Sequence, residues 1–529
     1  MQQTPTGTPK PMPAKPAGMF RMPDGRNVAV TFGLVTSLFL LWGFCNGMID
    51  TMDKHFQDQL HLTKAQSAWV QFAHYMGYAI MALPAGLLTR KIGYKGGIIS
   101  GLIMVAAGGF WFIPATQISE FWAFLLGVCF IAMGLTVLET VANPYTTVLG
   151  PKIFSATRIN LAQSFNGVGW IFGPVVGGAF FYSAGGSQVA HGQLWIPYAG
   201  VGVVVLVLAV LFYFAPMPDF SLRDYYLEDE ADTDVGMVRK HRSLMIFAFL
   251  FMNVAALGLS AYLVLNAILP FCGVSPTGIR WVTIAIVAAV LGGMPLLWSG
   301  ARKMPGQSIW AHPHFAGATL AQFFYVAAQA GIFSFFINYV ISELPAISEG
   351  AANLWPINGR AELRDGLLFV NEQGASRLQG FVGFLLFTIG RFVGAAILKR
   401  KPAHQVLGTY AAINVVLCGI VAMKLGWISV AAVFLSFYFM SIMFPTIFAL
   451  GIHGLGAQAK KKASAFIVMS ITGGALMPKV MGHLGDVYDM SIAFLMPFGC
   501  FAFIALYGFF WGKLSKSEGM IDLAAGKGH

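Results

Sequence analysis

Two carboxylates stand inside long apolar stretches of this sequence, each with an amide four residues away. Asp50 follows Asn46, and Glu139 precedes Asn143. A spacing of four places each pair on one face of a helix. A charged group at bilayer depth costs about 2.5–3.5 kcal/mol on insertion scales, so carboxylates in such positions indicate function.

A third apolar stretch carries two amides, Gln163 and Asn166, three residues apart. Sugar hydroxyls are both donors and acceptors, and amides and carboxylates can bind two of them at once. A carboxyl group in a low-dielectric environment also holds a proton more tightly than in water, which suits a proton carrier. The alternative for each amide is a simple hydrogen bond between helices. Asp53 is expected nearer the membrane surface than Asp50.

The second half of the chain offers fewer polar groups. Gln329 and Asn338 are its best candidates for substrate binding, although their spacing of nine does not require a shared face. Aromatic rings can stack on the apolar face of a sugar, and Tyr78 and Tyr325 are candidates for that role. The alternative for each ring is helix packing or an interfacial belt.

The composition shows which elements must position these groups. Of 529 residues, 57% are hydrophobic and 10% charged, with a mean hydropathy of +0.69. Soluble proteins are roughly 45–50% apolar and about 25% charged. These values exclude a soluble enzyme, a disordered chain and a disulfide scaffold. The five cysteines show no metal or disulfide spacing, so neither a metal nor a cofactor is expected.

The apolar stretches are long enough to cross a membrane. A hydrocarbon core about 30 Å thick requires roughly 20 apolar residues per helix. This rule predicts fourteen spans, at 29–52, 67–89, 96–115, 121–148, 158–183, 194–215, 243–270, 279–299, 316–343, 377–398, 404–424, 427–451, 463–484 and 490–513.

Lysine and arginine follow the even-numbered spans or precede the odd-numbered ones, as in 90–95, 239–242, 302–303, 399–401 and 460–462. Because basic loops stay in the cytoplasm, both termini are predicted there. The net charge of +11 therefore reflects topology rather than nucleic-acid binding.

Two pairs of spans repeat one pattern. Pro144 and Gly150 match Pro445 and Gly451 at a shift of 301, and Pro174 matches Pro478 at a shift of 304. Transporters built from repeats show such halves. The predicted domains are a disordered cytoplasmic segment (1–28), a six-helix bundle (29–216), an acidic cytoplasmic linker (217–242), two additional transmembrane helices (243–302), a second six-helix bundle (312–514) and a cytoplasmic tail (515–529).

Several stretches carry a family resemblance. They are Tyr94-Lys95-Gly96-Gly97-Ile98, Leu138-Glu139-Thr140-Val141-Ala142-Asn143-Pro144, Arg158-Ile-Asn160-Leu-Ala-Gln163-Ser-Phe-Asn166 and Phe444-Pro445-Thr446-Ile447-Phe448. Over about 30–216 and 312–513 the sequence resembles the major facilitator superfamily. Within it, the chain is most similar to the fucose–proton symporter family, which includes glucose/galactose transporters. Arg90 stands where the superfamily usually has aspartate.

The resemblance implies an all-α polytopic membrane protein with the major facilitator fold, in which two six-helix bundles carry a monosaccharide by alternating access, driven by protons. By motif, Asp50 and Glu139 match the family's residues for proton coupling and substrate binding. Asn46, Gln163 and Asn166 match its substrate-binding amides. The implied location is a bacterial inner membrane, and a monomeric transport unit is expected.

Other functions stay open. Coupling to sodium, or transport of another small organic solute, would use the same inventory of polar groups. A non-transporting membrane sensor is a smaller alternative. An enzyme is not expected, because no nucleophile, base or metal cluster converges in the sequence.

Overall fold

The computed structural model describes residues 18–22, 25–151, 155–182, 195–218, 243–269, 274–304, 308–398, 400–453, 455, 463 and 466–516. The acids of the predicted linker, the basic groups at 239–242 and 460–462, and the tail from 517 lie outside these residues. Residues 25–28 belong to the segment predicted to be disordered; here Asn27 forms an isolated bridge with Arg21, and Val28 is buried.

The N-terminal half folds into one bundle of long helices. They are α1 (Ala29–Gln59), the short α2 (Lys64–Ser67), α3 (Trp69–Ile118), α4 (Phe121–Val148), α5 (Ser155–Phe181) and α6 (Trp195–Phe214). Helix α3 contains two predicted spans, separated by a kink at Gly93 (φ 72°). Glycine adopts that left-handed conformation without steric cost, so the chain turns back there. Helix α1 packs on α5, and α3 on α4 and α6.

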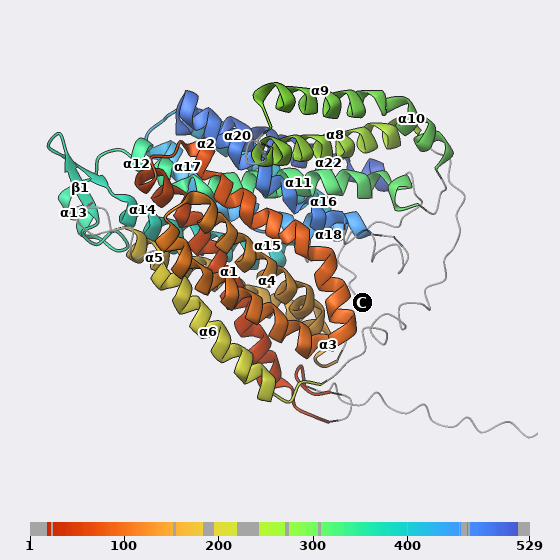
Figure 1. Cartoon of the computed structure of the whole chain (residues 1–529), viewed down its shortest axis with the longest axis horizontal. Helices are drawn as coiled ribbons and strands as arrows, with labels where there is room; N and C mark the ends of the chain where they lie inside the picture. The colour runs from red at the N-terminus through yellow and green to blue at the C-terminus, as the bar shows by residue number, and fades with distance from the viewer. Residues whose placement is uncertain are drawn as a thin grey trace, which may run out of the picture.

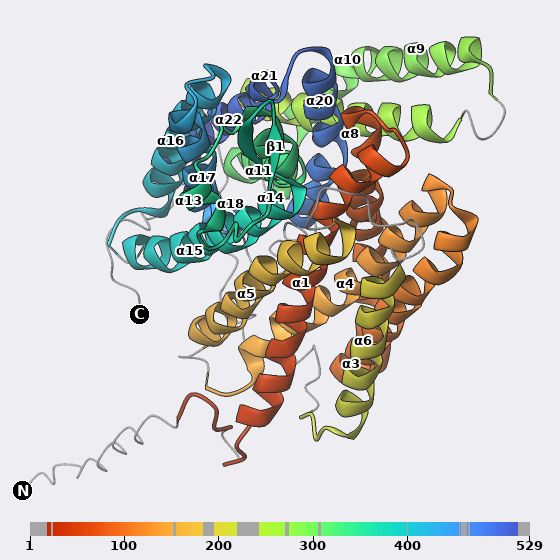
Figure 2. The ribbon, with the colours of Figure 1, turned by 90° about the vertical axis from the view of Figure 1, so that its left-hand side faces the viewer.

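The C-terminal half forms a second bundle, in which several spans are broken into two segments. Its elements are η4 (Ile309–Ala311), α11 (Pro313–Ser334), α12 (Phe336–Glu343), α13 (Glu349–Asn353), β1 (Ala361–Arg364), β2 (Leu367–Val370), α14 (Glu372–Leu378), the π-helical turn η5 (Gln379–Phe384), α15 (Leu385–Leu398), α16 (Ala403–Ala422), α17 (Trp427–Met440), α18 (Met443–Ile452), η6 (Ser470–Thr472), α20 (Gly473–Val487), α21 (Met490–Ala493) and α22 (Leu495–Lys516). Figure 2 shows this bundle beside the N-terminal one.

Ten stretches of the described chain are long and apolar enough to cross a membrane; some lie within one helix, and others join two or three consecutive segments. The remaining four predicted spans correspond to the first part of α3, to α5, to α8 (Ser243–Ile268) and to α20. The structure is thus the predicted polytopic helical protein, and the predicted set of fourteen spans agrees with its helices.

The two additional spans are α8 and the pair α9 (Pro276–Gly292) and α10 (Met294–Lys303). In Figure 1 they lie at the edge of the molecule, beyond α11. Asn253 of α8 forms two hydrogen bonds with α11. Its side chain accepts one from Thr319 Oγ1 (2.8 Å) and donates one to the Ala316 carbonyl (3.3 Å). The additional pair therefore packs on the C-terminal bundle.

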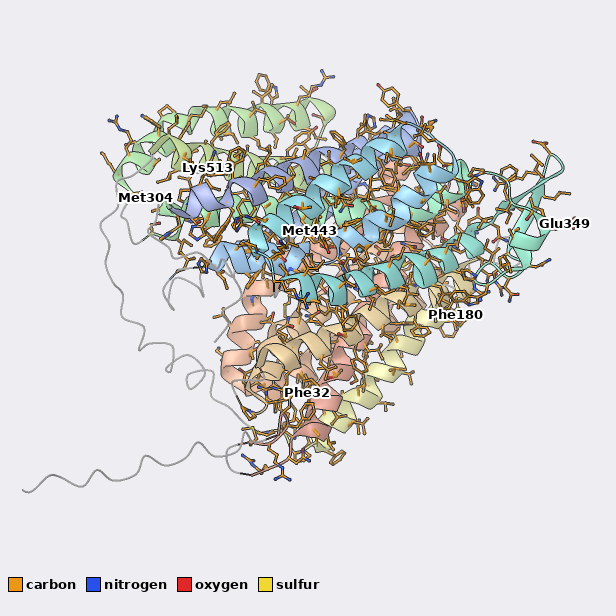
Figure 3. All side chains as sticks on the ribbon, turned by 180° about the vertical axis from the view of Figure 1, so that it is seen from behind. Phe32, Phe180, Met304, Glu349, Met443 and Lys513 are labelled. Carbon is orange, nitrogen blue, oxygen red and sulfur yellow. The ribbon has the colours of Figure 1, made fainter. Side chains whose placement is uncertain are left out.

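A β-hairpin marks one side of the molecule. Strands β1 and β2 pair antiparallel, with Ala361 opposite Val370, across a turn in which Asp365 and Gly366 both have positive φ. Asp-Gly is a preferred sequence for such a turn. In Figure 3, Glu349 and Phe180 lie toward this side, and Phe32 and Lys513 toward the other. We call the two sides the hairpin side and the opposite side.

The two bundles are joined on the hairpin side. Asp486 of α20 accepts hydrogen bonds from the backbone N–H groups of Lys64 and Ala65 (both 2.9 Å). The side-chain amides of Gln57 (α1) and Asn338 (α12) bind each other at 2.5 and 3.4 Å. We call these five residues the hairpin-side latch. In the described part of the chain, the hydrogen bonds between the bundles all lie on this side, so this side is closed.

Candidate functional site

The first predicted carboxylate belongs to a buried acid pair on α1. Asp50 is 5% exposed and Asp53 is 0% exposed. The side-chain amide of Gln71, on α3, donates to both, at 2.9 Å to Asp50 Oδ1 and 3.4 Å to Asp53 Oδ2. The expectation that Asp53 lies nearer the membrane surface than Asp50 stays a prediction, and the structure adds that the packing of α1 against α3 and α11 encloses its side chain.

The second carboxylate, Glu139, is half-buried on α4. Among the described residues it receives no side-chain hydrogen bond. The Tyr78 hydroxyl lies close enough to Glu139 and to Asn46 to interact with both. That hydroxyl also accepts a hydrogen bond from Trp42 Nε1 (2.6 Å). Helices α1, α3 and α4 thus bring Asn46, Tyr78 and Glu139 together.

The predicted amides divide between two roles. Gln163 of α5 donates to Asn143 Oδ1 of α4 at 3.2 Å, and both side chains are half-buried. Asn166 is 2% exposed, and its amide donates to the Phe39 carbonyl at 3.2 Å. That bond joins α5 to α1. The two helices approach so closely at Gly43 that a side chain at that position would collide with the Asn166 backbone. Asn166 therefore contributes directly to helix packing.

Two of the C-terminal candidates share helix α11, and the third lies elsewhere. Tyr325 is fully buried on α11, and Gln329, one turn further along, is half-buried. Tyr325 lies close enough to Arg391 and to Tyr75 of the N-terminal bundle to interact electrostatically with them. Asn338 instead lies in the hairpin-side latch, bound to Gln57. Its predicted contact with substrate stays a prediction, and its observed partner is another protein amide.

Aromatic rings fill the contact between the bundles near these groups. Trp170 of α5 lies 5.4 Å from the Phe333 ring and 4.9 Å from the Phe384 ring, measured between centroids. Phe333 also stacks on Phe437 at 4.8 Å. Aromatic pairs at such distances stabilise packing beyond their buried area. At this contact, both bundles therefore present aromatic rings.

Sequence reasoning missed several polar residues of this region: Gln57, Gln71, Gln322 and Gln379. Gln379 donates to the Phe333 carbonyl at 2.7 Å from within the π-helical turn. Gln322 is buried in the same helix as Tyr325 and Gln329, three and seven residues before them. Because this spacing places Gln322 on the same side of the helix as the two candidates, the sequence could have identified Gln322 as a third polar group there. The partners of Gln57 and Gln71 depend on contacts between helices, which no spacing reveals.

Two helical bundles that enclose carboxylates and amides at membrane depth define a class of protein, the secondary transporters with internal repeats. The described residues contain no group of three or more His, Cys, Asp or Glu side chains arranged to hold a metal ion.

Comparisons with known proteins agree with that class. The family model of the Major Facilitator Superfamily matches residues 28–357, and the chain belongs to this family. The L-fucose-proton symporter of Escherichia coli is 32% identical over 92% of this chain and 94% of its own length. A glucose/galactose transporter of Brucella abortus is 27% identical over 92% and 95%. The chain is accordingly a membrane transporter and not an enzyme.

A solved structure of the transporter FucP in the outward conformation is 31% identical to this chain. It covers 92% of this chain and 99% of the solved chain, with a TM-score of 0.56. A partially occluded inward-open structure of the xylose transporter XylE from E. coli, at 11% identity, has the same TM-score and supports the fold alone.

Proposed function

We propose that this chain is a proton-coupled symporter of a monosaccharide of the fucose, glucose or galactose type, working by alternating access. The observation that carries the proposal is Glu139, a half-buried carboxylate in the middle of α4 beside Tyr78 and Asn46. A carboxyl group there can exchange a proton when water reaches it and can accept a hydroxyl hydrogen bond from a sugar.

The roles of the remaining groups follow from their chemistry. Asp50 and Glu139 serve proton coupling and contact the substrate. Asn46, Asn143, Gln163 and Asn166 supply amide donors and acceptors for sugar hydroxyls, joined from the C-terminal bundle by Gln329 and Asn338. Tyr78 and Tyr325 offer ring faces and hydroxyls. Asn166 already binds the Phe39 carbonyl, so we expect its effect to pass through the packing of α1 on α5.

We infer the orientation from charge. Lys91, Lys95, Arg302, Lys303 and Arg400 lie in turns or at helix ends on the opposite side. Basic loops favour the cytoplasm, so the hairpin side faces outward and both termini lie in the cytoplasm of a bacterial inner membrane. The domain boundaries predicted from sequence belong to the same proposal, with each transport unit a single chain.

Uptake into proteoliposomes tests the function directly. The purified protein is reconstituted, an inward proton gradient is imposed, and radiolabelled fucose, glucose, galactose and xylose are offered in turn. We expect gradient-dependent accumulation of at least one sugar, abolished by a protonophore. If no sugar accumulates, the symporter proposal is wrong.

The alternative of sodium coupling is separated by exchanging sodium for potassium at constant pH. Proton coupling predicts that accumulation is unchanged by the exchange. Accumulation that requires an inward sodium gradient and survives the protonophore would instead establish a sodium symporter.

A further inference from the structure

Asp53 is a buried acid that the proposed mechanism above does not use. Asn46, Asp50, Asp53 and Gln57 follow one another on α1 at spacings of four, three and four, which places them on one helical stripe. Gln57, at the end of this stripe, binds Asn338 of the other bundle. Asp53 lies one turn before Gln57, so it stands between the proposed substrate site and the hairpin-side latch.

The surroundings of Asp53 belong to both bundles. Gln71 of the N-terminal bundle donates to Asp53 Oδ2 at 3.4 Å, and Ser334 of the C-terminal bundle lies close to its carboxyl group. Asp53 Oδ1 is buried and has no hydrogen-bond partner among the described residues. The carboxyl group is thus enclosed by the closed bundles and is only weakly solvated by protein groups.

No described cation compensates Asp53. The ionisable groups on α1 and on the elements that pack around it toward the hairpin side are Asp50, Lys54, His55, Asp58, Lys64, His74, Tyr75, Tyr78, Glu139, Tyr182, Tyr198, Tyr325, Tyr339 and Glu343. Lys54 is paired with Asp58, and Lys64 with Asp486. Lys479 lies over the Trp69 ring, 3.5 Å from its centroid. Asp53 instead has a second acid, Asp50, as its neighbour.

Burial of an ionised carboxylate without a cation is strongly unfavourable. Two acids that share one amide donor add mutual repulsion when both are ionised. The closed hairpin side is therefore compatible with a neutral Asp53. Separation of the bundles on this side would admit water to Asp53 and remove the penalty for its charge.

We propose that Asp53 is a second proton-binding residue, whose protonation permits the bundles to close on the hairpin side. This inference rests on the proposed proton coupling and extends it, since it links a proton taken from the outside to the movement that encloses the sugar. Gln71 is the positioning residue, because its one amide group holds Asp50 and Asp53 together.

Distance measurements by spin labelling test the proposal. Labels are attached to cysteines introduced at Glu120 and Tyr488, two exposed positions on the hairpin side of different bundles, in a background without the native cysteines. The full-length protein in nanodiscs is measured from acidic to alkaline pH without sugar. We expect a short distance at low pH and a growing population of longer distances as the pH rises.

Asp53→Asn imitates the neutral acid, and we expect it to lose the pH response and to keep the short distance throughout. Asp53→Glu restores a carboxyl group and should restore the response. The matched control is Asp58→Asn, on the same helix but paired with Lys54, which should respond like the unmodified protein. Asp50→Asn should also retain a response, which separates the two acids.

Two results would overturn the proposal: a pH-independent distance in the unmodified protein, or an unchanged pH response in Asp53→Asn. If Asp53→Asn does not fold, Gln71→Leu tests the proposal instead. This change removes the hydrogen-bond donor to the ionised acid, so the closed state should persist to higher pH. An unchanged response in Gln71→Leu would then count against the proposal. The measurement requires neither sugar nor gradient, so its outcome is independent of the uptake assay.

Discussion

The two bundles of this transporter share a fold but not a chemistry. The N-terminal bundle carries carboxylates at membrane depth, at Asp50, Asp53 and Glu139, with amides around them. In the described part of the C-terminal bundle, the carboxylates lie on the hairpin side instead, and its interior presents rings such as Phe333 and Phe437. In the described residues, the two bundles therefore differ in where they carry carboxylates: the N-terminal bundle buries two of them, and the C-terminal bundle buries none.

This difference has a physical basis. A transporter that couples a proton to a sugar needs ionisable groups near the substrate, but each buried charge carries a desolvation cost. Concentration of the acids in one bundle restricts that cost to one surface. The other bundle can then move against it with rings, which need no hydrogen-bond partners to be buried.

The largest effect on transport is expected from loss of Glu139, the proposed coupling acid of the N-terminal bundle. Glu139→Gln keeps the size and hydrogen-bonding capacity of the side chain but removes its proton exchange. We expect proton-driven sugar accumulation to be lost, while counterflow exchange of sugar continues. Both are measured in proteoliposomes. The control is Glu120→Gln, at the exposed start of the same helix, which should transport normally. Concentrative uptake by Glu139→Gln would refute the assignment.

A smaller effect, on sugar affinity, is expected when one of the amides proposed to bind the sugar is removed. Gln163→Ala removes an amide that binds Asn143 and is proposed to contact the sugar. A neutral hydrogen bond contributes about 0.5–1.5 kcal/mol, so sugar binding should weaken by roughly 2- to 10-fold. Tryptophan fluorescence titration measures the affinity. Ser100→Ala is the control, because that hydroxyl bonds only to the Gly97 carbonyl of its own helix. Equal affinities for Gln163→Ala and the unmodified protein would remove Gln163 from the site.

The smallest effect, on protein stability, is expected when an ion pair of the C-terminal bundle is removed. On the hairpin side, Lys424 lies 2.9 Å from Asp489 and 4.0 Å from Glu343, the last residue of α12. Burial acts to raise the pKa of Asp489, but the Ile492 backbone N–H and the Lys424 ammonium outweigh it and hold that pKa below the usual value. The contribution to stability is therefore present above the unfolded-state pKa and is lost as the pH falls through the lower folded-state value.

Lys424→Met should accordingly lower the stability of the protein at pH 7 by less than about 1 kcal/mol, because the pair is partly exposed. The deficit should shrink as the pH falls through the pKa of Asp489, and transport should be unaffected. Thermal unfolding in detergent across pH measures the effect, with the exposed Lys303→Met as control. A loss of transport coupling in Lys424→Met would show that C-terminal charges also take part in the mechanism.

Much of the molecule was predictable from the chain. The spans were predicted from hydropathy, and the two halves from the repeated prolines and glycines. Asn46 and Glu139 were predicted to face one polar patch, and in the structure both lie close to the Tyr78 hydroxyl; their contact with a substrate stays a prediction. Asn143 and Gln163 were predicted to face the same polar patch, and the structure adds the hydrogen bond between them.

The sequence did not reveal the contacts between the bundles. Asp53 was predicted to lie nearer the membrane surface than Asp50, and that stays a prediction; its complete burial was not predictable, because burial depends on what lies opposite, which here is α11. Asn338 was predicted to contact the sugar, and its partner in the structure is Gln57, 281 residues away in the sequence. Residue type alone does not distinguish an amide that binds a ligand from one that binds another amide.

The sequence by itself determined that this chain is a helical membrane protein, that it has two related halves, and which residues carry charge into the bilayer. Hydrophobicity and helical spacing are local properties, so they can be read along the chain. Only the tertiary structure decided which acids share a donor, which side of the molecule is closed, and that the additional helices pack on the C-terminal bundle. These features depend on surfaces that meet only when the bundles pack, because a side chain's environment is set by partners distant in sequence.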